Sequence, residues 1–551
     1  MKILYSIFIC LEVLAIFNLL IIVHELGHFL AARWRGLRIE GFGIWFGKPL
    51  WQKKINGVTY SLGSIPAGGF VKLPQMAPME ALEGETEIPL EELTPISAMD
   101  KIIVAFAGPL FSFLLAATFA VIVWGIGRPV SESEATTTIG YVIPDSPAAK
   151  VGLKPGDKIL EIDGKPVTRF NGMSDDSVTW RIVRSEGETI PIKVERNGET
   201  LSFNPTPIIP KTNFWNRKGL RQIQILPAET PMVAKVLPNT PGADAGLKPN
   251  DLILGVNGQR IYSAMGISDY ALNHPKEDLV LDVERGSNAA ASQGKELHLP
   301  FKPRGGLIEK VTKDSPAEAA GLMAGDRIIA VDGNPIRFQE ELSDYVQKHA
   351  NQELKLTVEH NGNQREVRVT PQMPVDEDHP RIGILWGDSD GILFDTFGKF
   401  HVIHPGPVEQ IQASVMSIVN TVGAVTARKS NVSVQHLGGP VMMMRIYYMM
   451  FESEQGWRMA LWFSVVLNVN LAMMNLFPIP VLDGGHILFA IVEAIRRRPV
   501  SYKVLEFVNT AAAMLVIGFM LFVTFFDVQD LFSSKSPTIK FKPKDAQEQK
   551  K

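Results

Sequence analysis

Four stretches of the chain are apolar and long enough to cross a lipid bilayer, which takes roughly 20 residues in a helix. They are residues 3–23, 102–124, 460–477 and 504–526. The first begins like a signal peptide, but its apolar run is long and continues directly into His24 without a small-residue cleavage site. The pattern therefore predicts a multi-pass α-helical membrane protein with about four spans.

Basic residues beside the spans predict its orientation, because Lys and Arg are in excess in cytoplasmic loops. One basic cluster, from Arg33 to Lys54, follows the first span, and another, from Arg496 to Lys503, precedes the fourth. We expect both clusters in the cytoplasm. The region between the second and third spans and the C-terminal tail should then lie on the outer side.

Three similar stretches follow one another between the second and third spans, at residues 139–164, 233–258 and 307–333. Each contains an apolar strand, a Ser-Pro or Thr-Pro helix start, a Gly-rich turn ending in Asp, and a second strand closed by a tight turn. The repeats resemble bacterial PDZ domains, which bind peptides as an added strand. Peptide binding and a packed size filter are the two alternatives for their role.

Two other segments carry recognisable patterns. Residues 407–428 have apolar positions at helical spacing, which predicts a helix lying on the membrane surface or packing against the last repeat. The acidic, proline-flanked stretch at residues 80–92 reads as a solvated cytoplasmic loop without an assigned function.

The motif His24-Glu25-Leu26-Gly27-His28 lies at the end of the first span. Two histidines four residues apart project from one face of a helix and can hold one zinc ion. Glu25 is the candidate general base. Ionisable groups are costly in a membrane unless they are paired, metal-bound or hydrated, so the position of the motif favours a metal site.

Tetrahedral zinc with a water in one position needs one more protein ligand. Asp483 is the candidate, since it lies at a cytoplasmic span end like the two histidines. His486 is a rival ligand three residues further along. Pro478 and Pro480 should interrupt the helix here, and broken backbone at membrane depth is tolerated where it lines a cavity.

Together, the two motifs and the repeats resemble the site-2 protease family of intramembrane zinc metalloproteases (peptidase family M50), of the bacterial regulator of sigma-E protease type. The resemblance runs nearly end to end. It implies zinc bound by His24, His28 and Asp483, catalysis by Glu25 as in a metalloendopeptidase, and substrate contact by Asn475. It also implies a membrane-associated β-sheet that holds the substrate as an added strand. The further substrate-binding residues expected on this basis are Gly43, Gly68, Gly69, Pro478 and Pro480.

The resemblance further implies a bacterial inner-membrane protein with periplasmic α+β PDZ-like domains and a zinc site near the cytoplasmic face. The partner would be a single-span membrane protein, an anti-sigma factor already trimmed outside the membrane, and remnant signal peptides are also compatible. Two features depart from the family. Ser112 stands near the position of a family asparagine after Gly108-Pro109, so the local support role of that residue is not carried over. Three repeats also exceed the usual two.

Composition excludes other classes of function. The chain has 55 basic and 58 acidic residues without a basic stripe, which gives no reason to expect nucleic acid as a partner. Cys10 is its single cysteine, so neither an intrachain disulfide nor a cysteine zinc site can form. A non-catalytic PDZ scaffold is the alternative from another class, but Glu25 and all the ligands are present. A zinc transporter lacks support, because ionisable residues are scarce elsewhere in the spans.

The expected domains are 1–35 (first span with the zinc motif), 36–97 (membrane-associated sheet and acidic loop), 98–127 (second span), 128–226, 227–303 and 304–376 (PDZ-like repeats), 377–456 (surface-helix region), 457–498 (third span with the Asp483 motif) and 499–551 (fourth span and tail).

Overall fold

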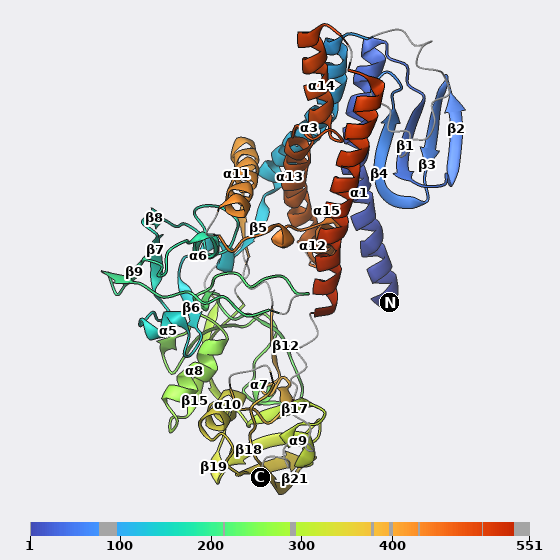
Figure 1. The fold of residues 1–551 in the computed structure, drawn as a ribbon. Coiled ribbons are helices and arrows are strands. Elements are labelled where there is room, and N and C mark those ends of the chain that lie inside the picture. Colours follow the sequence, from blue (N-terminus) through green and yellow to red (C-terminus); the bar gives the residue numbers. More distant parts are fainter. Residues whose placement is uncertain are drawn as a thin grey trace, which may run out of the picture. The chain divides into compact units, whose positions relative to one another are not determined.

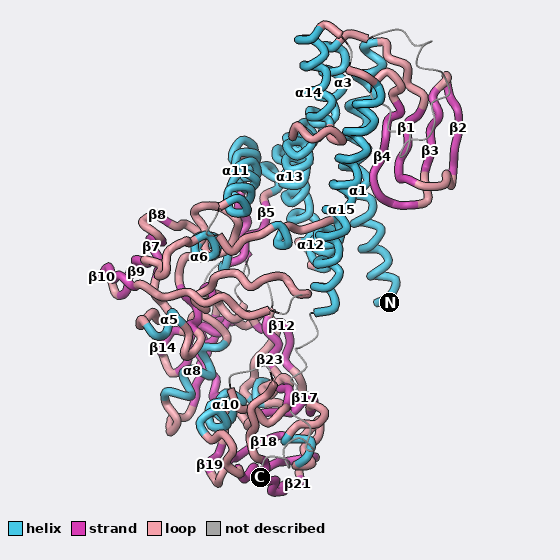
Figure 2. Tube along the Cα trace, in the orientation of Figure 1, coloured by secondary structure: helices cyan, strands magenta, loops and turns pink. Residues whose placement is uncertain are grey.

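The computed structural model describes residues 2–76, 96–212, 215–286, 294–375, 379–395, 400–427, 430–453, 455–498, 500–533 and 541. The predicted acidic loop at residues 80–92 lies outside this set. The chain forms two compact units. The membrane unit contains Met1–Pro129, Pro210–Leu220 and Val402–Phe532, and the repeat unit contains Val130–Ile209, Arg221–His401 and Ser533–Lys551. Figure 2 shows that the first is mostly helical and the second mostly strand and loop.

Four helices of the membrane unit are long and apolar enough to cross a bilayer, which confirms the four predicted spans. They are α1 (Lys2–Arg35), α3 (Ala98–Ile126), α13 (Gly456–Asn475) and α15 (Tyr502–Ser533). Helix α1 runs unbroken through the histidine motif. Ser97 caps α3 by accepting a hydrogen bond from the Asp100 amide.

Helix α3 packs against both α1 and α13 (Figure 1). Their contacts use small residues, as is usual between membrane helices. A Cβ on Gly27 of α1 would lie 2.4 Å from the Ala107 carbonyl oxygen of α3, so only glycine permits this approach. This close contact between α1 and α3 places the histidine motif against α3.

Helix α11 (Pro407–Thr426) forms in the segment predicted as a helix at residues 407–428, and it packs on α3 and α13 of the membrane unit. Gln410 is buried and donates from Nε2 to the Ala120 carbonyl oxygen at 3.0 Å. Ser414 and Asn420 are also buried. Ile411 and Val415 of the apolar stripe pack against the core of the spans, so both apolar and polar residues of α11 contact them. Helices η2 (Val434–His436), α12 (Pro440–Glu452) and α14 (Asp483–Arg496) complete the unit.

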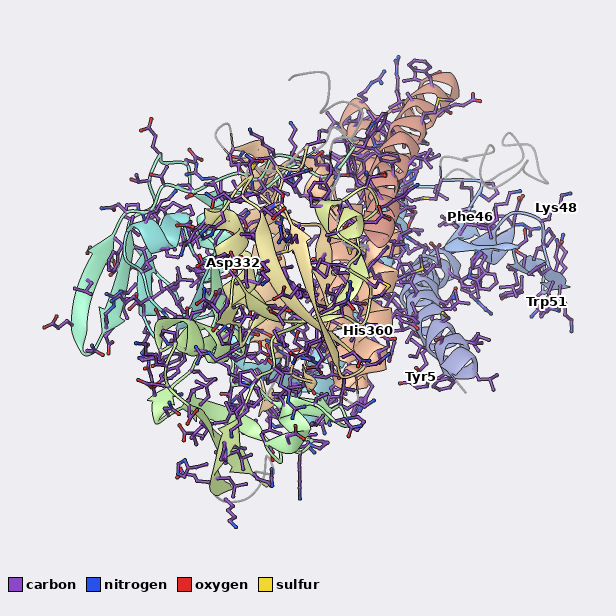
Figure 3. All side chains as sticks on the ribbon, turned by 90° about the horizontal axis from the view of Figure 1, so that it is seen from below. Tyr5, Phe46, Lys48, Trp51, Asp332 and His360 are labelled. Carbon is purple, nitrogen blue, oxygen red and sulfur yellow. The ribbon has the colours of Figure 1, made fainter. Side chains whose placement is uncertain are left out.

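The membrane-associated sheet lies beside α1 (Figure 1) and has the strand order β2-β3-β1-β4. Its strands are β1 (Gly41–Phe46), β2 (Trp51–Ile55), β3 (Val58–Leu62) and β4 (Ile65–Lys72). Phe42 and Val71 pack on Phe29 of α1. Trp51 is exposed on β2, and Figure 3 labels it with Phe46 and Lys48 on this sheet. Strand β4 forms one edge of the sheet.

The repeat unit contains three PDZ-like repeats, each with its own hydrophobic core. Their elements share one order: strand, short helix, strand, two-residue strand, helix, hairpin and closing strand. The first has β6 (Ile139–Val142), α5 (Pro147–Lys150), β7 (Lys158–Ile162), β8 (Lys165–Pro166), α6 (Val178–Arg184), β9 (Ile192–Arg196), β10 (Glu199–Phe203) and β11 (Ile225–Pro227). The second has β12 (Val233–Val236), α7 (Pro241–Asp244), β13 (Leu252–Val256), β14 (Gln259–Arg260), α8 (Met265–Asn273), β15 (Leu279–Arg285) and β16 (Lys295–Phe301). The third has β17 (Gly306–Val311), α9 (Pro316–Ala319), β18 (Arg327–Val331), β19 (Asn334–Pro335), α10 (Gln339–Lys348), β20 (Leu354–His360), β21 (Asn363–Val369) and β22 (Ile384–Trp386). The short elements β5 (Arg128–Ser131), α4 (Glu132–Ala135) and β24 (Phe400–Ile403) lie outside the repeats.

The closing strand of the second repeat corrects its predicted boundary at residue 303. Strand β23 (Ile392–Phe394) pairs with β12, and Ile392 belongs to the core of the second repeat. The third repeat, which its own strand β22 closes onto β17, is therefore inserted within the second. The sequence pattern predicts a separate region at residues 377–456, because this closing strand is only three residues long.

The Gly-x-x-x-Gly/Asn-Asp turns that reveal the repeats have a structural reason. Their aspartates are fully buried and each binds an arginine of the same repeat at 2.7 Å: Asp157 with Arg196, Asp251 with Arg285 and Asp326 with Arg365. Each aspartate also accepts a backbone N–H three residues before it. A buried carboxylate requires such partners, so the motif is fixed by folding.

The segment Pro210–Leu220 lies between β10 and β11 in sequence but belongs to the membrane unit. Arg217 donates to Asp527 and Asp530 of α15 at 2.7 Å each. Asp527 is 1 % exposed and also accepts the Gly439 and Met442 amides, which caps the N-terminus of α12.

Candidate metal centre

Three potential metal ligands from two helices meet at one point, although the sequence separates them by more than four hundred residues. His24 and His28 lie on one face of α1, and Asp483 is the first residue of α14. The carboxylate oxygens of Asp483 lie 3.3 Å from His24 Nε2 and 3.3 Å from His28 Nε2, and the two Nε2 atoms are 3.3 Å apart. Within the described residues, this is the cluster of His, Cys, Asp and Glu side chains that could hold a metal ion.

The spacing of these atoms fits zinc. Tetrahedral zinc with bonds of about 2.0–2.2 Å to nitrogen and oxygen places its ligand atoms about 3.3–3.6 Å apart. The three separations of 3.3 Å lie at the short end of this interval. Two imidazoles and one carboxylate leave a fourth position open, which is typical of catalytic rather than structural zinc.

The other nitrogen of each imidazole is held by α3. His24 Nδ1 lies 3.0 Å from the Ser112 hydroxyl, and His28 Nδ1 lies 2.8 Å from the Val104 carbonyl oxygen. Such partners orient a metal-binding histidine and keep its Nε2 free for the ion. The support role of the family asparagine was not carried over to position 112 from the sequence, but the Ser112 hydroxyl reaches His24 from this helix.

Backbone geometry places Asp483 at the start of α14. A Cβ on Gly484 would lie 2.3 Å from the Leu476 carbonyl oxygen, and one on Gly485 would lie 2.2 Å from the Ile479 carbonyl oxygen. These glycines let the first turn of α14 pack on the broken segment that follows α13. At its other end, α14 is joined to α3 by an ion pair of 2.7 Å between Glu493 and Lys101.

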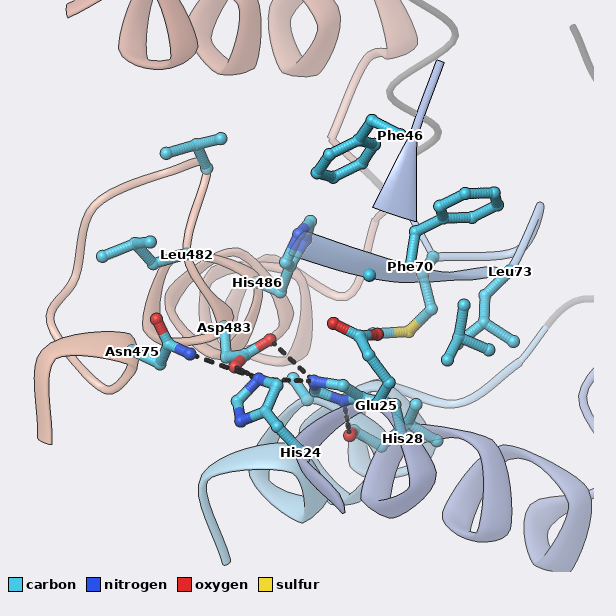
Figure 4. A pocket seen from close by; sticks show the side chains of 16 residues that line it. His24, Glu25, His28, Phe46, Phe70, Leu73, Asn475, Leu482, Asp483 and His486 are labelled. Carbon is cyan, nitrogen blue, oxygen red and sulfur yellow. Dashed lines mark hydrogen bonds and ion pairs between the residues drawn. The ribbon is translucent and has the colours of Figure 1, made fainter. Parts of the chain in front are cut away.

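The cluster opens into a cavity of about 230 Å³ (Figure 4). Glu25 lines it next to the metal ligands, where a general base would have to be. Asn475 also lines it, with its amide nitrogen 3.2 Å from His24 Nε2. His486, the rival ligand, lines the same cavity but lies outside the three-residue cluster.

The predicted substrate-binding residues divide into two groups. Gly69 lines the cavity, and a Cβ there would lie 3.0 Å from Glu25 Cγ. Gly43 and Gly68 lie beneath aromatic rings instead, as described below. Pro478 and Pro480 lie in the turn between α13 and α14, and the neighbouring residues Val481 and Leu482 line the cavity in their place.

Sequence reasoning missed the apolar side of the cavity. Phe46 of β1, Phe70 of β4, Leu73 and Met76 all line it. Figure 4 shows the two phenylalanine rings close to each other on the side of Glu25 away from Asp483. The sequence contains one clue to these rings, because Phe46 and Phe70 each stand within three residues of Gly43, Gly68 or Gly69.

Comparisons with known proteins found relatives that align over most of the chain and a solved domain that matches a small part of it. A candidate zinc metalloprotease of Neisseria meningitidis is 25% identical over 523 residues, covering 93% of this chain and 97% of its own. A regulator of sigma E protease of Salmonella typhi is 26% identical over 539 residues, covering 92% of this chain and 96% of its own. The PDZ domain of an SdrC-like protein of Listeria monocytogenes matches 15% of this chain and 88% of that domain, with 27% identity and a TM-score of 0.15.

The model of peptidase family M50 matches residues 12–519, which includes both helices of the metal cluster. A relative that aligns with 93% of this chain carries the name of a zinc metalloprotease. The chain is a membrane zinc metalloprotease and belongs to peptidase family M50.

Proposed function

We propose that this metalloprotease hydrolyses a peptide bond within a membrane-spanning segment of another protein. One observation carries the proposal: His24, His28 and Glu25 lie on α1, a helix long and apolar enough to cross a bilayer, rather than on a soluble domain. A substrate bond that reaches this site has to come from the membrane or its surface.

The edge strand β4 of the sheet offers a way to hold a substrate next to the metal centre. A peptide bond in a membrane helix is protected by its own hydrogen bonds, so cleavage requires local unwinding. Strand β4 has β1 on one side, and its residues Gly69, Phe70 and Val71 line the cavity. An unwound segment added to this edge would recover its backbone hydrogen bonds beside Glu25. The Asn475 amide, which lines the same cavity, would hold the segment from the other side.

His24, His28 and Asp483 would hold the zinc ion. When bound, zinc supplies Lewis-acid chemistry that activates a water molecule and polarises a carbonyl group. Glu25 accepts the proton of the attacking water and passes it to the amine that leaves. The Ser112 hydroxyl and the Val104 carbonyl oxygen keep both imidazoles in the orientation that these steps need.

The substrate class that we propose is a single-span membrane protein, such as an anti-sigma factor trimmed outside the membrane, or a remnant signal peptide. The name of the Salmonella relative, regulator of sigma E protease, favours the first. We place the protein in a bacterial inner membrane, with the repeats in the periplasm and the metal centre near the cytoplasmic face. The basic residues that follow α1 favour this orientation.

The test uses the full chain purified in detergent and a single-span reporter without an outer domain. Wild type, Glu25→Gln and Asp483→Ala are compared for cleavage and bound zinc. We expect cleavage within the span by wild type alone, with zinc lost in Asp483→Ala and kept in Glu25→Gln. Cleavage by Glu25→Gln would refute the role of this residue, and cleavage restricted to soluble segments would refute intramembrane proteolysis.

A further inference from the structure

Asn18 is a polar residue within the first span, six residues before His24. Polar side chains inside a membrane segment are costly and tend to serve a function. Its amide nitrogen donates to the Leu14 carbonyl oxygen at 2.6 Å, and its Oδ1 accepts the Trp45 indole N–H at 2.5 Å. Asn18 therefore ties the span to strand β1 of the sheet.

Trp45 has an unusual backbone conformation. Its φ of 67° lies in the left-handed region, which a bulky residue adopts only when its surroundings hold it there. The pairing of β1 with β4 shifts register between Ile44 and Phe46, so Trp45 forms an irregularity of the bulge type. Bulges near active sites re-aim a neighbouring side chain. The neighbour here is Phe46.

Phe46 and Phe70 form a stacked pair with ring centroids 6.1 Å apart and an interplanar angle of 15°. The rings lie over glycines that leave room for them. A Cβ on Gly68 would come within 2.1 Å of the Phe46 ring, and one on Gly43 within 2.3 Å of the Phe70 ring. Both rings line the cavity of Glu25, as Figure 4 shows.

We propose that Phe46 and Phe70 determine specificity by receiving an apolar substrate side chain next to the scissile bond, and that Asn18 and Trp45 position this pair. The inference rests on the proposed function and names its substrate class. A strand added to β4 would direct alternate side chains to the face that carries Phe70. This aromatic wall buries an apolar side chain favourably and offers no partner to a charged one.

The experiment measures kcat/KM on reporters that carry Leu, Ala or Asp on either side of the mapped scissile bond. Wild type should prefer Leu to Ala by roughly tenfold or more at one of these positions and should not cut the Asp reporter. Phe46→Ala and Phe70→Ala should bring the Leu/Ala ratio close to one with zinc content unchanged. Trp51→Ala, an exposed aromatic of the same sheet, should keep the wild-type ratio.

The positioning role has its own readout. Asn18→Leu and Trp45→Phe each remove the indole hydrogen bond, so each should lower the Leu/Ala ratio without loss of zinc. The double variant should be no worse than either single one, because both remove the same interaction. Additive effects of the two changes would overturn this role.

The two proposals can fail separately. Cleavage within the span by wild type, together with an unchanged Leu/Ala ratio in both phenylalanine variants, overturns the specificity role and leaves the proposed function standing. Zinc-loaded wild type that cuts no reporter within the span overturns the proposed function. If the alanine variants do not fold, Phe46→Asn and Phe70→Asn replace the apolar wall by polar side chains, and an unchanged Leu/Ala ratio in them contradicts the inference.

Discussion

The hydroxyl of Ser112 offers a sharp test of how α3 supports the metal centre. Ser112 is fully buried on α3, and its oxygen lies 3.0 Å from His24 Nδ1. When His24 binds zinc through Nε2, its Nδ1 carries the proton and donates to this hydroxyl. Ser112→Ala removes the acceptor and leaves a buried N–H without a partner.

The expected size of the effect follows from this loss. An unsatisfied buried donor costs about 1–3 kcal/mol, and each 1.4 kcal/mol is about a tenfold change in an equilibrium constant. Loss of an outer hydrogen-bond partner of a zinc ligand typically weakens metal binding about 10–100-fold. We therefore expect the zinc affinity of Ser112→Ala to fall roughly tenfold to hundredfold, and its activity to recover when free zinc is raised.

The assay is a competition titration of the detergent-purified protein against a fluorescent zinc chelator. Thr118→Ala is the matched control, because the Thr118 hydroxyl on the same helix bonds only to its own turn, at the Leu114 carbonyl oxygen, among the contacts described. Ser112→Asn should bind zinc more tightly than Ser112→Ala, since its amide restores a polar partner. Equal zinc affinity in Ser112→Ala and wild type would refute the orienting role of this hydroxyl.

Three further changes probe other parts of the molecule. Gly108→Ala places a methyl group 2.1 Å from His28 Nε2, so the purified variant should lack zinc in metal analysis, and full zinc content would contradict the close packing of α3 on this ring. Arg217→Ala leaves Asp527 buried without its cation, which should lower stability by about 3–5 kcal/mol in denaturant unfolding, and an unchanged midpoint would contradict it. Burial in the repeat unit raises the pKa of Asp390 to about 7. Between about pH 4 and about pH 7, the folded state therefore binds more protons than the unfolded state. Wild-type stability should fall by up to about 1.4 kcal/mol per unit as pH rises from about 4 to about 7, and Asp390→Asn should flatten this slope in hydrogen exchange of the repeats.

The sequence predicted those parts of the fold that depend on local patterns. Long apolar runs predicted the spans, because a bilayer imposes a minimum length on a helix. The spacing of His24 and His28 predicted one shared helix face, and the structure confirms that face. Asp483 could be selected because it follows the Pro478 and Pro480 segment at the end of a span that is predicted to reach the same membrane face as the histidines.

Contacts between segments that are distant in the sequence could not be predicted from local patterns. Strand β23 closes the second repeat across the whole of the third, and three residues carry too little periodicity to show this. The polar contact of α11 with the spans could not be predicted either, since the partner of Gln410 is a backbone carbonyl of α3.

The support of the metal centre shows why such contacts matter for function. Ser112 and Val104 have no motif of their own, yet each holds a metal-binding histidine at hydrogen-bond distance. In a membrane, a polar atom without a partner is costly, so an active site made of imidazoles and carboxylates needs a partner for every remaining nitrogen and oxygen. Short polar side chains and backbone carbonyls on the neighbouring helix can provide these partners without opening the helix packing. A polar residue within a predicted span should therefore be examined first as a support for the chemistry nearby.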